Sequence, residues 1–211
     1  VGGLGVDNIK KLDLLDRPEL EATLDFELGS KNLLITFHPV TLENDTSDQQ
    51  MAELFAALET LKDTKLIFTM PNADTHRRVI FDMIKEFVDS HPNARAYTSL
   101  GQLNYLSCVK HVDGVLGNSS SGLIEAPSLG KGTVNIGDRQ RGRIKAESVI
   151  DCSPVRGSII VALQKLYSDA FQLGLKTSRN PYGEGGASKK IVQILKECKL
   201  EAILKKTFYD L

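Results

Sequence analysis

The sequence has no long apolar run, and none of its stretches approaches the roughly 20 consecutive apolar residues that a membrane-spanning helix needs. A basic, then apolar, then small-residue leader is also missing from its first residues, so we expect no signal peptide. Acidic and basic residues nearly cancel, at 27 against 26. This balance argues against non-specific electrostatic binding to nucleic acid or anionic lipid. We therefore expect neither a membrane nor a nucleic acid as a partner.

Cysteine is scarce as well. Cys108, Cys152 and Cys198 are scattered, odd in number and outside any CxxC pair, and no histidine lies at zinc-ligand spacing from them. A secreted disulfide scaffold would have more cysteines at closer spacing. The pattern favours a reducing cytoplasm, with the cysteines as small core fillers. It indicates neither a metal site nor a cofactor.

Several catalytic motifs are missing. There is no GxxxxGK[ST], which excludes a P-loop protein, and neither GxSxG nor HExxH occurs. The glycines of residues 183–186 follow no predicted strand and form no dinucleotide fingerprint. The remaining composition, 41% hydrophobic and 25% charged, is that of an ordinary globular protein.

From Asn32 onward, short apolar runs alternate with longer segments of helical spacing. The runs are 33–37, 65–69, 94–97, 114–116 and 133–136, and the intervening segments are 47–61, 74–90, 99–110 and 119–129. Segments 7–15 and 18–24 before them, and 154–167 and 187–198 after them, also have helical patterns, and Ser47 with Gln50 and Ser99 with Gln102 have capping-box spacing. Such alternation predicts a doubly wound parallel sheet, an α/β fold that is Rossmann-like.

In such a sheet, ligands bind beyond the carboxyl ends of the strands. His38 follows the first apolar run and is held by Pro39, and its imidazole can donate to a phosphate oxygen or act as an acid near neutral pH. Asn72 follows the second run, after Pro71, and can contact a ligand. The structural alternatives are a histidine that only bonds a neighbouring loop and polar residues that only cap a helix.

The ends of two later runs carry the strongest signal. After residue 116, Ser119 and Ser120 open a predicted helix, whose free amides and positive dipole end attract phosphate oxygens. Glu125, further along it, can accept hydrogen bonds from vicinal hydroxyls, as an acid holds ribose. Arg139 begins a run of three arginines within five residues after the last apolar run and can neutralise a diphosphate. A serine cap and a solvated basic run are the plainer alternatives.

Five motifs in order carry a resemblance to a known family. They are His38-Pro39-Val40-Thr41, Pro71-Asn72-Ala73-Asp74, Gly117-Asn118-Ser119-Ser120-Ser121-Gly122 with Glu125, Gly137-Asp138-Arg139-Gln140 with Gly142-Arg143, and Asn180-Pro181-Tyr182-Gly183. The series resembles the C-terminal domain of UDP-N-acetylglucosamine 2-epimerases over nearly the whole chain. The segment 5–9 resembles the crossing between that family's domains. We therefore expect a linker and helix over 1–15 and a nucleotide-binding domain over 16–211.

The resemblance implies one half of a two-domain GT-B-like fold, with a UDP-sugar in the cleft. It implies a catalytic role for His38 and a UDP site formed by Asn72, Ser119, Ser120, Glu125 and Arg139. Pro39 and the triple serine resemble the hydrolysing branch, in which anti elimination of UDP and addition of water release N-acetylmannosamine. That branch carries its catalytic carboxylates in an N-terminal domain absent from this chain, so we expect the chain alone to be inactive. The family also tends to form homodimers.

Three other readings stay open at this stage. The chain could be the nucleotide domain of a GT-B glycosyltransferase, a non-hydrolysing UDP-N-acetylglucosamine 2-epimerase, or a non-catalytic nucleotide-binding module. Fold alone does not choose among them, because function lies in the site. The sequence also leaves open which sugar and which base are bound.

Overall fold

At the centre of the structure is a parallel sheet of six strands in the order β3-β2-β1-β4-β5-β6. The computed structural model describes residues 1–39, 46–71 and 77–198. Within them the strands are β1 (Lys31–Thr36), β2 (Thr64–Thr69), β3 (Ala94–Tyr97), β4 (Gly114–Gly117), β5 (Gly132–Ile136) and β6 (Val149–Cys152). This order is the one typical of dinucleotide-binding folds and confirms the predicted doubly wound, Rossmann-like sheet.

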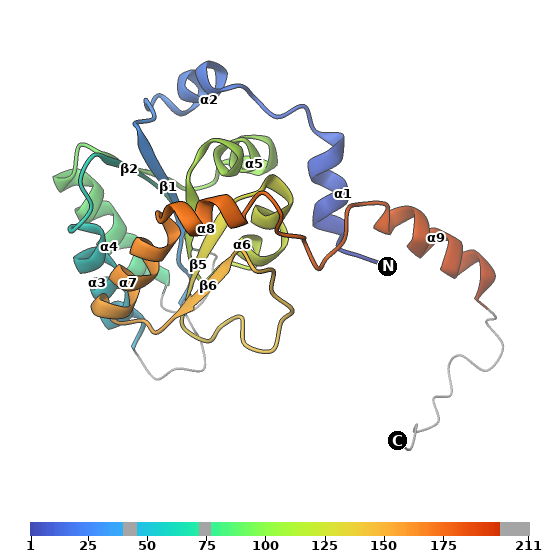
Figure 1. Ribbon diagram of the computed structural model, residues 1–211. Helices are drawn as coiled ribbons and strands as arrows, with labels where there is room; N and C mark the ends of the chain where they lie inside the picture. The colour runs from blue at the N-terminus through green and yellow to red at the C-terminus, as the bar shows by residue number, and fades with distance from the viewer. Residues whose placement is uncertain (40–45, 72–76, 199–211) are drawn as a thin grey trace.

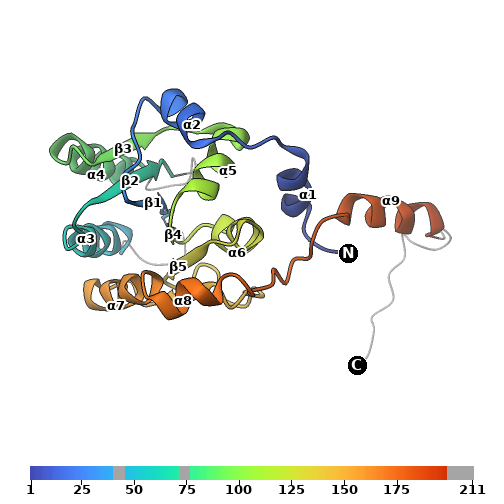
Figure 2. The ribbon, with the colours of Figure 1, turned by 45° about the horizontal axis from the view of Figure 1, so that its top comes forward.

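Helices cover both faces of the sheet (Figures 1 and 2). On one face lie α3 (Ser47–Leu58), α4 (Arg77–Ser90), α7 (Arg156–Leu166) and α8 (Asp169–Gly174), and on the other lie α2 (Arg17–Leu24), α5 (Gly101–His111) and α6 (Ser121–Ile124). The first and last described helices, α1 (Leu4–Lys11) and α9 (Ala187–Glu197), contact each other, and α9 projects away from the sheet.

The core follows from the period-two alternation of the strands. In β1, Leu33 and Ile35 pack under α3 and α4, whereas Leu34 packs on the opposite face with α2 and α5. All three side chains are fully buried. Both faces of the central strand must therefore be apolar, and this produces the continuous apolar run seen in the sequence.

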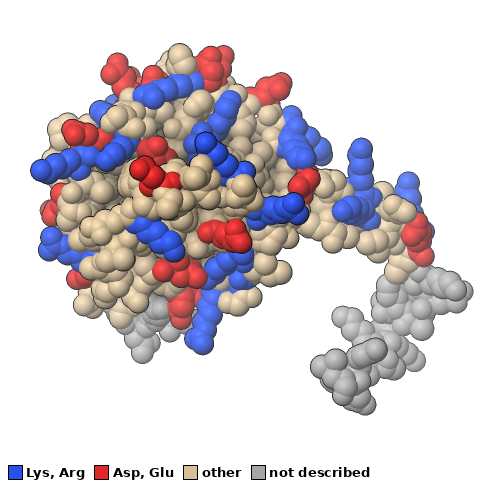
Figure 3. Space-filling view, viewed as in Figure 1, with Lys and Arg blue, Asp and Glu red and all other residues tan. Residues whose placement is uncertain are grey.

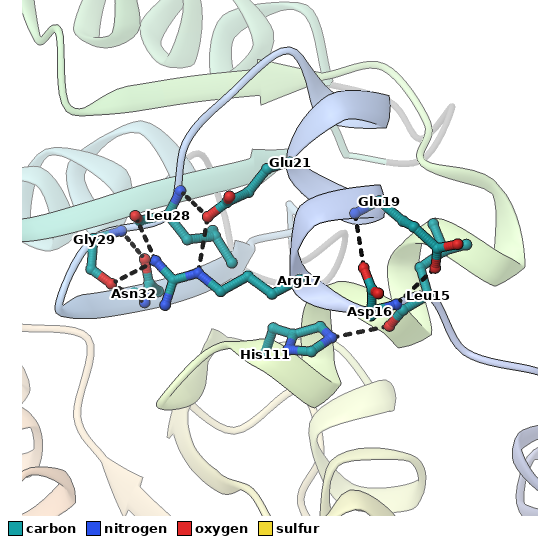
Figure 4. A network of polar contacts seen from close by, with 9 residues as sticks. All are labelled: Leu15, Asp16, Arg17, Glu19, Glu21, Leu28, Gly29, Asn32 and His111. Atoms are coloured by element: carbon teal, nitrogen blue, oxygen red, sulfur yellow. Dashed lines mark hydrogen bonds and ion pairs between the residues drawn. The ribbon is translucent and has the colours of Figure 1, made fainter.

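The two capping boxes predicted from residue spacing are not where the structure has one. Helix α5 begins two residues after Ser99, whose hydroxyl accepts a hydrogen bond from the Gly101 amide at 3.2 Å, so no box forms there. Helix α3 begins at Ser47, which puts its cap one residue earlier than predicted. A complete capping box stands instead at the start of α2, where Asp16 and Glu19 each accept a hydrogen bond from the other's backbone amide (Figure 4).

The same close-up shows how α2 is anchored to the beginning of β1 (Figure 4). Arg17 pairs with Glu21 at 2.8 Å and donates to the carbonyl of Leu28 at 2.6 Å. Asn32 closes the turn by accepting from the Gly29 amide at 2.7 Å. These bonds fix the entry into β1, at the end of the strand opposite to His38.

The three cysteines are free thiols and differ in burial. Cys108 is buried in the core on the α5 side, as expected, and burial raises the pKa of its thiol to about 12. Cys152 is half-buried in β6. Cys198 is exposed after the end of α9, so the prediction that it fills the core is wrong. Helix α9 carries no sheet packing at that point, and its last residues face solvent.

Charged side chains of both signs are interspersed over the face shown in Figure 3. The mixture reflects the near balance of 26 basic and 27 acidic residues. None of the helices in the described ranges is long and apolar enough to cross a membrane.

The topological switch point lies between β1 and β4, where the chain returns to the middle of the sheet after β3. Gly117, the last residue of β4, has a φ of +132°, and a Cβ there would lie 2.0 Å from the carbonyl oxygen of Thr36. The ends of the two strands can approach this closely only because residue 117 lacks a side chain.

Helix α9 is joined to α1 by Asp7. Its carboxylate accepts hydrogen bonds from the Ala187 and Ser188 amides, at 3.0 and 2.8 Å, and from the Ser188 hydroxyl. Amides in the first turn of a helix lack partners within the helix, so Asp7 acts as a cap supplied from another helix. These bonds, that from the Ser188 side chain foremost, lower the pKa of Asp7 to about 2.

We predict that Gly117→Ala destabilises the fold by about 3 kcal/mol or more, because the added methyl group meets a backbone carbonyl in a conformation that L-residues avoid. Gly157→Ala in α7 is the control, since a Cβ there meets nothing within 4 Å, and it should be neutral or stabilising. Urea unfolding followed by circular dichroism measures both. Equal destabilisation by the two substitutions would contradict the close approach of β1 and β4.

We also predict that the contact between α1 and α9 weakens in acid. The folded-state pKa of Asp7, about 2, lies below its ordinary value of 3.8. The stabilisation is therefore complete above about pH 4 and is lost as the pH falls through about 2. The amide resonance of Ser188 should titrate near pH 2 in NMR spectra, and Asp7→Asn should abolish this titration. A midpoint near the ordinary value would mean that Ser188 does not hold the carboxylate.

Candidate functional site

A buried asparagine joins the loops at the switch point. Asn118 directly follows β4 and is 1% exposed. Its side-chain oxygen accepts from the His38 amide at 2.7 Å, and its side-chain nitrogen donates to the His38 carbonyl at 2.8 Å. Its own amide donates to the carbonyl of Thr36 at 3.1 Å. The residues that follow β1 are therefore tied to those that follow β4.

The loop after β5 is attached to the same residue. Arg139 and Gln140 both donate to the carbonyl of Asn118, at 3.1 and 2.8 Å. Gln140 is buried, whereas Arg139 is exposed. The arginine is thus oriented toward the serine turn, although it comes from a different strand. The loops after β1, β4 and β5 meet at Asn118.

The serine turn differs from the single helix predicted over 119–129. Helix α6 has one turn, Ser121–Ile124, and is followed by a 3-10 helix, Ala126–Leu129. Pro127 explains the break, because proline has no amide hydrogen and its ring clashes with the carbonyl four residues earlier. So short a helix adds little dipole, and any anion site here must rest on individual donors.

Such donors are present. Within the described part of the chain, no group accepts a hydrogen bond from the backbone amide of Ser119 or of Ser120. Among the described residues, the Ser119 hydroxyl accepts only a long bond, 3.4 Å, from the Ser121 amide. Two neighbouring free amides beside hydroxyl groups form a site suited to an anion.

A cleft of about 450 Å³ opens at this edge of the sheet. Its lining includes His38, which is 6% exposed, together with Ser119 and Tyr105. The loop after β3 and the start of α5, residues 98–102, form another wall. Thr36 and Thr69 also line the cleft, and their hydroxyls bond each other at 2.6 Å. The cleft therefore spans the ends of β1 to β4, as the switch-point rule predicts.

Glu125 lies next to this cleft, beneath helix α1. A Cβ on Gly5 would lie 2.6 Å from one oxygen of the Glu125 carboxylate, so the helix approaches the carboxylate closely. Burial raises the pKa of Glu125, and the Ser121 hydroxyl partly opposes this rise. The carboxylate thus sits in a partly desolvated place, where a hydrogen-bond donor from a ligand would be strongly favoured.

The structure brings most of the predicted site residues together. His38 and Ser119 line one cleft, Ser120 is the N-cap residue of α6, and Arg139 contacts the backbone at Asn118. Glu125 follows at the end of α6. Asn72 lies outside the described residues, so its role stays a prediction.

Sequence reasoning missed the residues that hold the site together. Asn118 and Gln140 belong to motifs that carry the resemblance but were given no role, and Tyr105 was not considered. The wall at 98–102 directly follows a strand that was placed correctly, at Ala94–Tyr97. Ligands bind beyond the carboxyl ends of parallel strands, so inspecting the residues after this strand as well would have pointed to 98–102.

The fold and the site define a doubly wound α/β domain with a cleft at the switch point of its sheet. Residues 1–196 match the UDP-N-acetylglucosamine 2-epimerase family. The chain is 36% identical to a GDP/UDP-N,N'-diacetylbacillosamine 2-epimerase (hydrolyzing) of Campylobacter jejuni, covering 100% of this chain and 55% of that protein. It is also 36% identical to the polysialic acid biosynthesis protein P7 of Escherichia coli, covering 100% and 54%. The chain therefore belongs to the UDP-N-acetylglucosamine 2-epimerase family.

Solved structures share the fold. A co-structure of S. aureus MnaA with UDP matches with a TM-score of 0.71 at 18% identity, over 98% of this chain and 55% of that one. The UDP-GlcNAc 2-epimerase of Methanocaldococcus jannaschii, in complex with UDP-GlcNAc and UDP, matches with a TM-score of 0.68 at 16% identity, over 94% and 54%. The chain spans about half the length of these relatives, and its fold is one half of a GT-B-like pair, as predicted.

We predict that Asn118→Ala destabilises the fold by about 2–4 kcal/mol, because it removes both buried side-chain bonds to the His38 backbone. Asn93→Ala is the matched control. It removes one bond, from the Asn93 side chain to the Thr64 carbonyl at 2.8 Å, and should cost about 1 kcal/mol. Chemical unfolding of both variants gives the comparison. A loss at Asn118 no larger than that at Asn93 would refute its central role.

Proposed function

We propose that this chain binds the nucleoside diphosphate of a UDP-sugar in the cleft beyond β1 and β4. The observation that carries the proposal is the pair of amides at Ser119 and Ser120 that have no acceptor among the described residues, at the point where three strand-end loops meet. Phosphate oxygens accept hydrogen bonds but donate none, so they match a site made of amides and hydroxyls.

Two further groups complete the phosphate site. The Arg139 guanidinium is held at the Asn118 carbonyl through one nitrogen, and its other N–H groups have no acceptor in the part of the chain that the structure describes, so they can bind a ligand. Its charge is permanent, so it can neutralise a diphosphate at any physiological pH. His38 lines the same cleft as Ser119, and its backbone is fixed by Asn118. We assign it contact with the diphosphate and the reacting sugar.

The activity that we propose for the whole protein is hydrolysing 2-epimerisation of a UDP-sugar. The hydrolysing type is supported by 36% identity to the Campylobacter jejuni protein, whose name includes that reaction. In this proposal UDP leaves by anti elimination, and water then adds to release a free 2-epimeric sugar, such as N-acetylmannosamine from UDP-N-acetylglucosamine. Pro39 and the three serines at 119–121 support it further.

We propose that the carboxylates acting at the sugar carbons belong to a second, N-terminal domain, which closes over the cleft. Closure would exclude water and orient the sugar, which catalysis requires. On this proposal residues 1–15 connect the two domains, and residues 16–211 bind the nucleotide. We further propose that the whole protein forms a homodimer and acts in a reducing cytoplasm. No metal and no cofactor is needed for the reaction.

We predict that affinity for this chain falls from UDP to UMP to uridine, because each lost phosphate removes contacts to the serine turn. Arg139→Ala should weaken UDP binding about tenfold and should reduce the preference for UDP over UMP. Arg141→Ala is the control and should bind UDP normally, because Arg141 is exposed in the same loop but, among the described residues, lacks the bond to the Asn118 carbonyl that Arg139 makes. Isothermal titration calorimetry at fixed salt measures all three ligands.

The proposal fails if uridine binds as tightly as UDP, or if the two arginine substitutions have equal effects. Equal effects would mean that the arginines act only through general surface charge, which salt screens.

A further inference from the structure

The turn at residues 180–183, which lies between α8 and α9, is bonded to the end of α6. The side-chain nitrogen of Asn180 donates to the carbonyl of Ile124 at 2.8 Å and to the hydroxyl of Ser128 at 2.6 Å. Ile124 is the last residue of α6, and the last carbonyls of a helix have no partner within it. Asn180 therefore caps α6 from a distant part of the chain.

Tyr182 is held in this turn from two sides. Its amide donates to the side-chain oxygen of Asn180 at 2.9 Å, and its carbonyl accepts from the Gly3 amide at 2.8 Å. A Cβ on Gly3 would lie 3.2 Å from the Cβ of Tyr182, so the N-terminal residues pack directly against the tyrosine. The backbone of Tyr182 thus has a fixed position relative to α6.

The side chain of Tyr182 reaches the loop between β5 and β6, residues 137–148, which we call the arginine loop. Its hydroxyl donates to the carbonyl of Ile144 at 3.1 Å. Near its other end, the same loop is bonded to the Asn118 carbonyl through Arg139. The arginine loop is therefore attached to the rest of the molecule at two points.

The two attachment points lie on either side of the serine turn. Asn118 directly precedes Ser119, whereas Tyr182 is anchored through Asn180 to the end of α6. Arg139 and residues 141–144 are exposed, so packing restrains the arginine loop little. With the bond at Asn118 alone, the loop could pivot about that carbonyl. The hydroxyl of Tyr182 removes this freedom.

We propose that Tyr182 is a positioning residue, which holds the arginine loop so that the Arg139 guanidinium faces the amides of Ser119 and Ser120 before a ligand arrives. This inference rests on the proposed binding of a UDP-sugar, in which both groups contact the diphosphate. A group that is already held in its bound geometry loses less conformational entropy on binding, and the affinity is higher for that reason. Tyr182 itself contacts no ligand and acts through Arg139.

A double-mutant cycle tests this role, with the affinities for UDP and UMP measured by isothermal titration calorimetry. Tyr182→Phe removes only the hydroxyl, and it should weaken UDP binding about fivefold and UMP binding less. In a chain that already carries Arg139→Ala, the same substitution should have no further effect, because the group that Tyr182 positions is gone. A hydroxyl that only stabilised the fold would not depend on Arg139 in this way.

Tyr97→Phe is the matched control. The Tyr97 hydroxyl also donates to a carbonyl far away in the chain, that of Leu24 at 2.7 Å, but this bond joins β3 to α2. The control should lower the midpoint of thermal unfolding about as much as Tyr182→Phe does. It should leave the preference for UDP over UMP unchanged, with or without Arg139.

The outcomes separate this inference from the proposed function. Failure of the unaltered chain to bind UDP overturns the proposed function, and the role of Tyr182 with it. If Arg139→Ala weakens UDP binding but Tyr182→Phe does not, the role of Tyr182 alone is overturned. Equal weakening of UDP binding by Tyr182→Phe in the presence and absence of Arg139 also overturns it, and would mean that the hydroxyl serves only the fold.

Discussion

The paired hydrogen bonds between Asn118 and the backbone of His38 are the interaction on which the site depends. They form where β1 and β4 lie side by side and the direction of winding reverses, so the loops there diverge and leave a crevice. Gly117 permits the close approach of β4 to β1. The Asn118 carbonyl accepts hydrogen bonds from Arg139 and Gln140 of the loop after β5. One buried amide thus sets the positions of three strand ends.

This arrangement places different chemistry on different elements. The serine turn offers amides and hydroxyls, the β5 loop offers a guanidinium, and the end of α6 offers a carboxylate beneath α1. The helix that presses on Glu125 is also the helix that holds α9 through Asp7. The Glu125 carboxylate is therefore closely approached by α1, one of the two helices that lie outside the sheet.

Much of the fold could be predicted, because continuous apolar strands and amphipathic helices leave clear periods in the sequence. The strand at Ala94–Tyr97 was placed correctly, and five of the six described strands were found. The edge strand β6 was missed because Val149–Cys152 is short and only partly apolar. The helix at 119–129 was overextended because the effect of Pro127 was not weighed.

The site was predictable only in part. Strand-end position pointed to His38, Ser119 and Arg139, but periodicity carries no information about which buried amide connects the loops. Asn118 acts through contacts between segments far apart in the chain, which a single sequence does not display. Asn72 lies outside the described residues and remains a prediction.

The most direct measurement of the central claim is a crystal structure of this chain with UDP. We expect the diphosphate on the Ser119 and Ser120 amides, within reach of Arg139 and His38, and the ribose beside Glu125. Electron density for UDP elsewhere on the chain, or a diphosphate that makes no contact with the serine turn, would contradict the account.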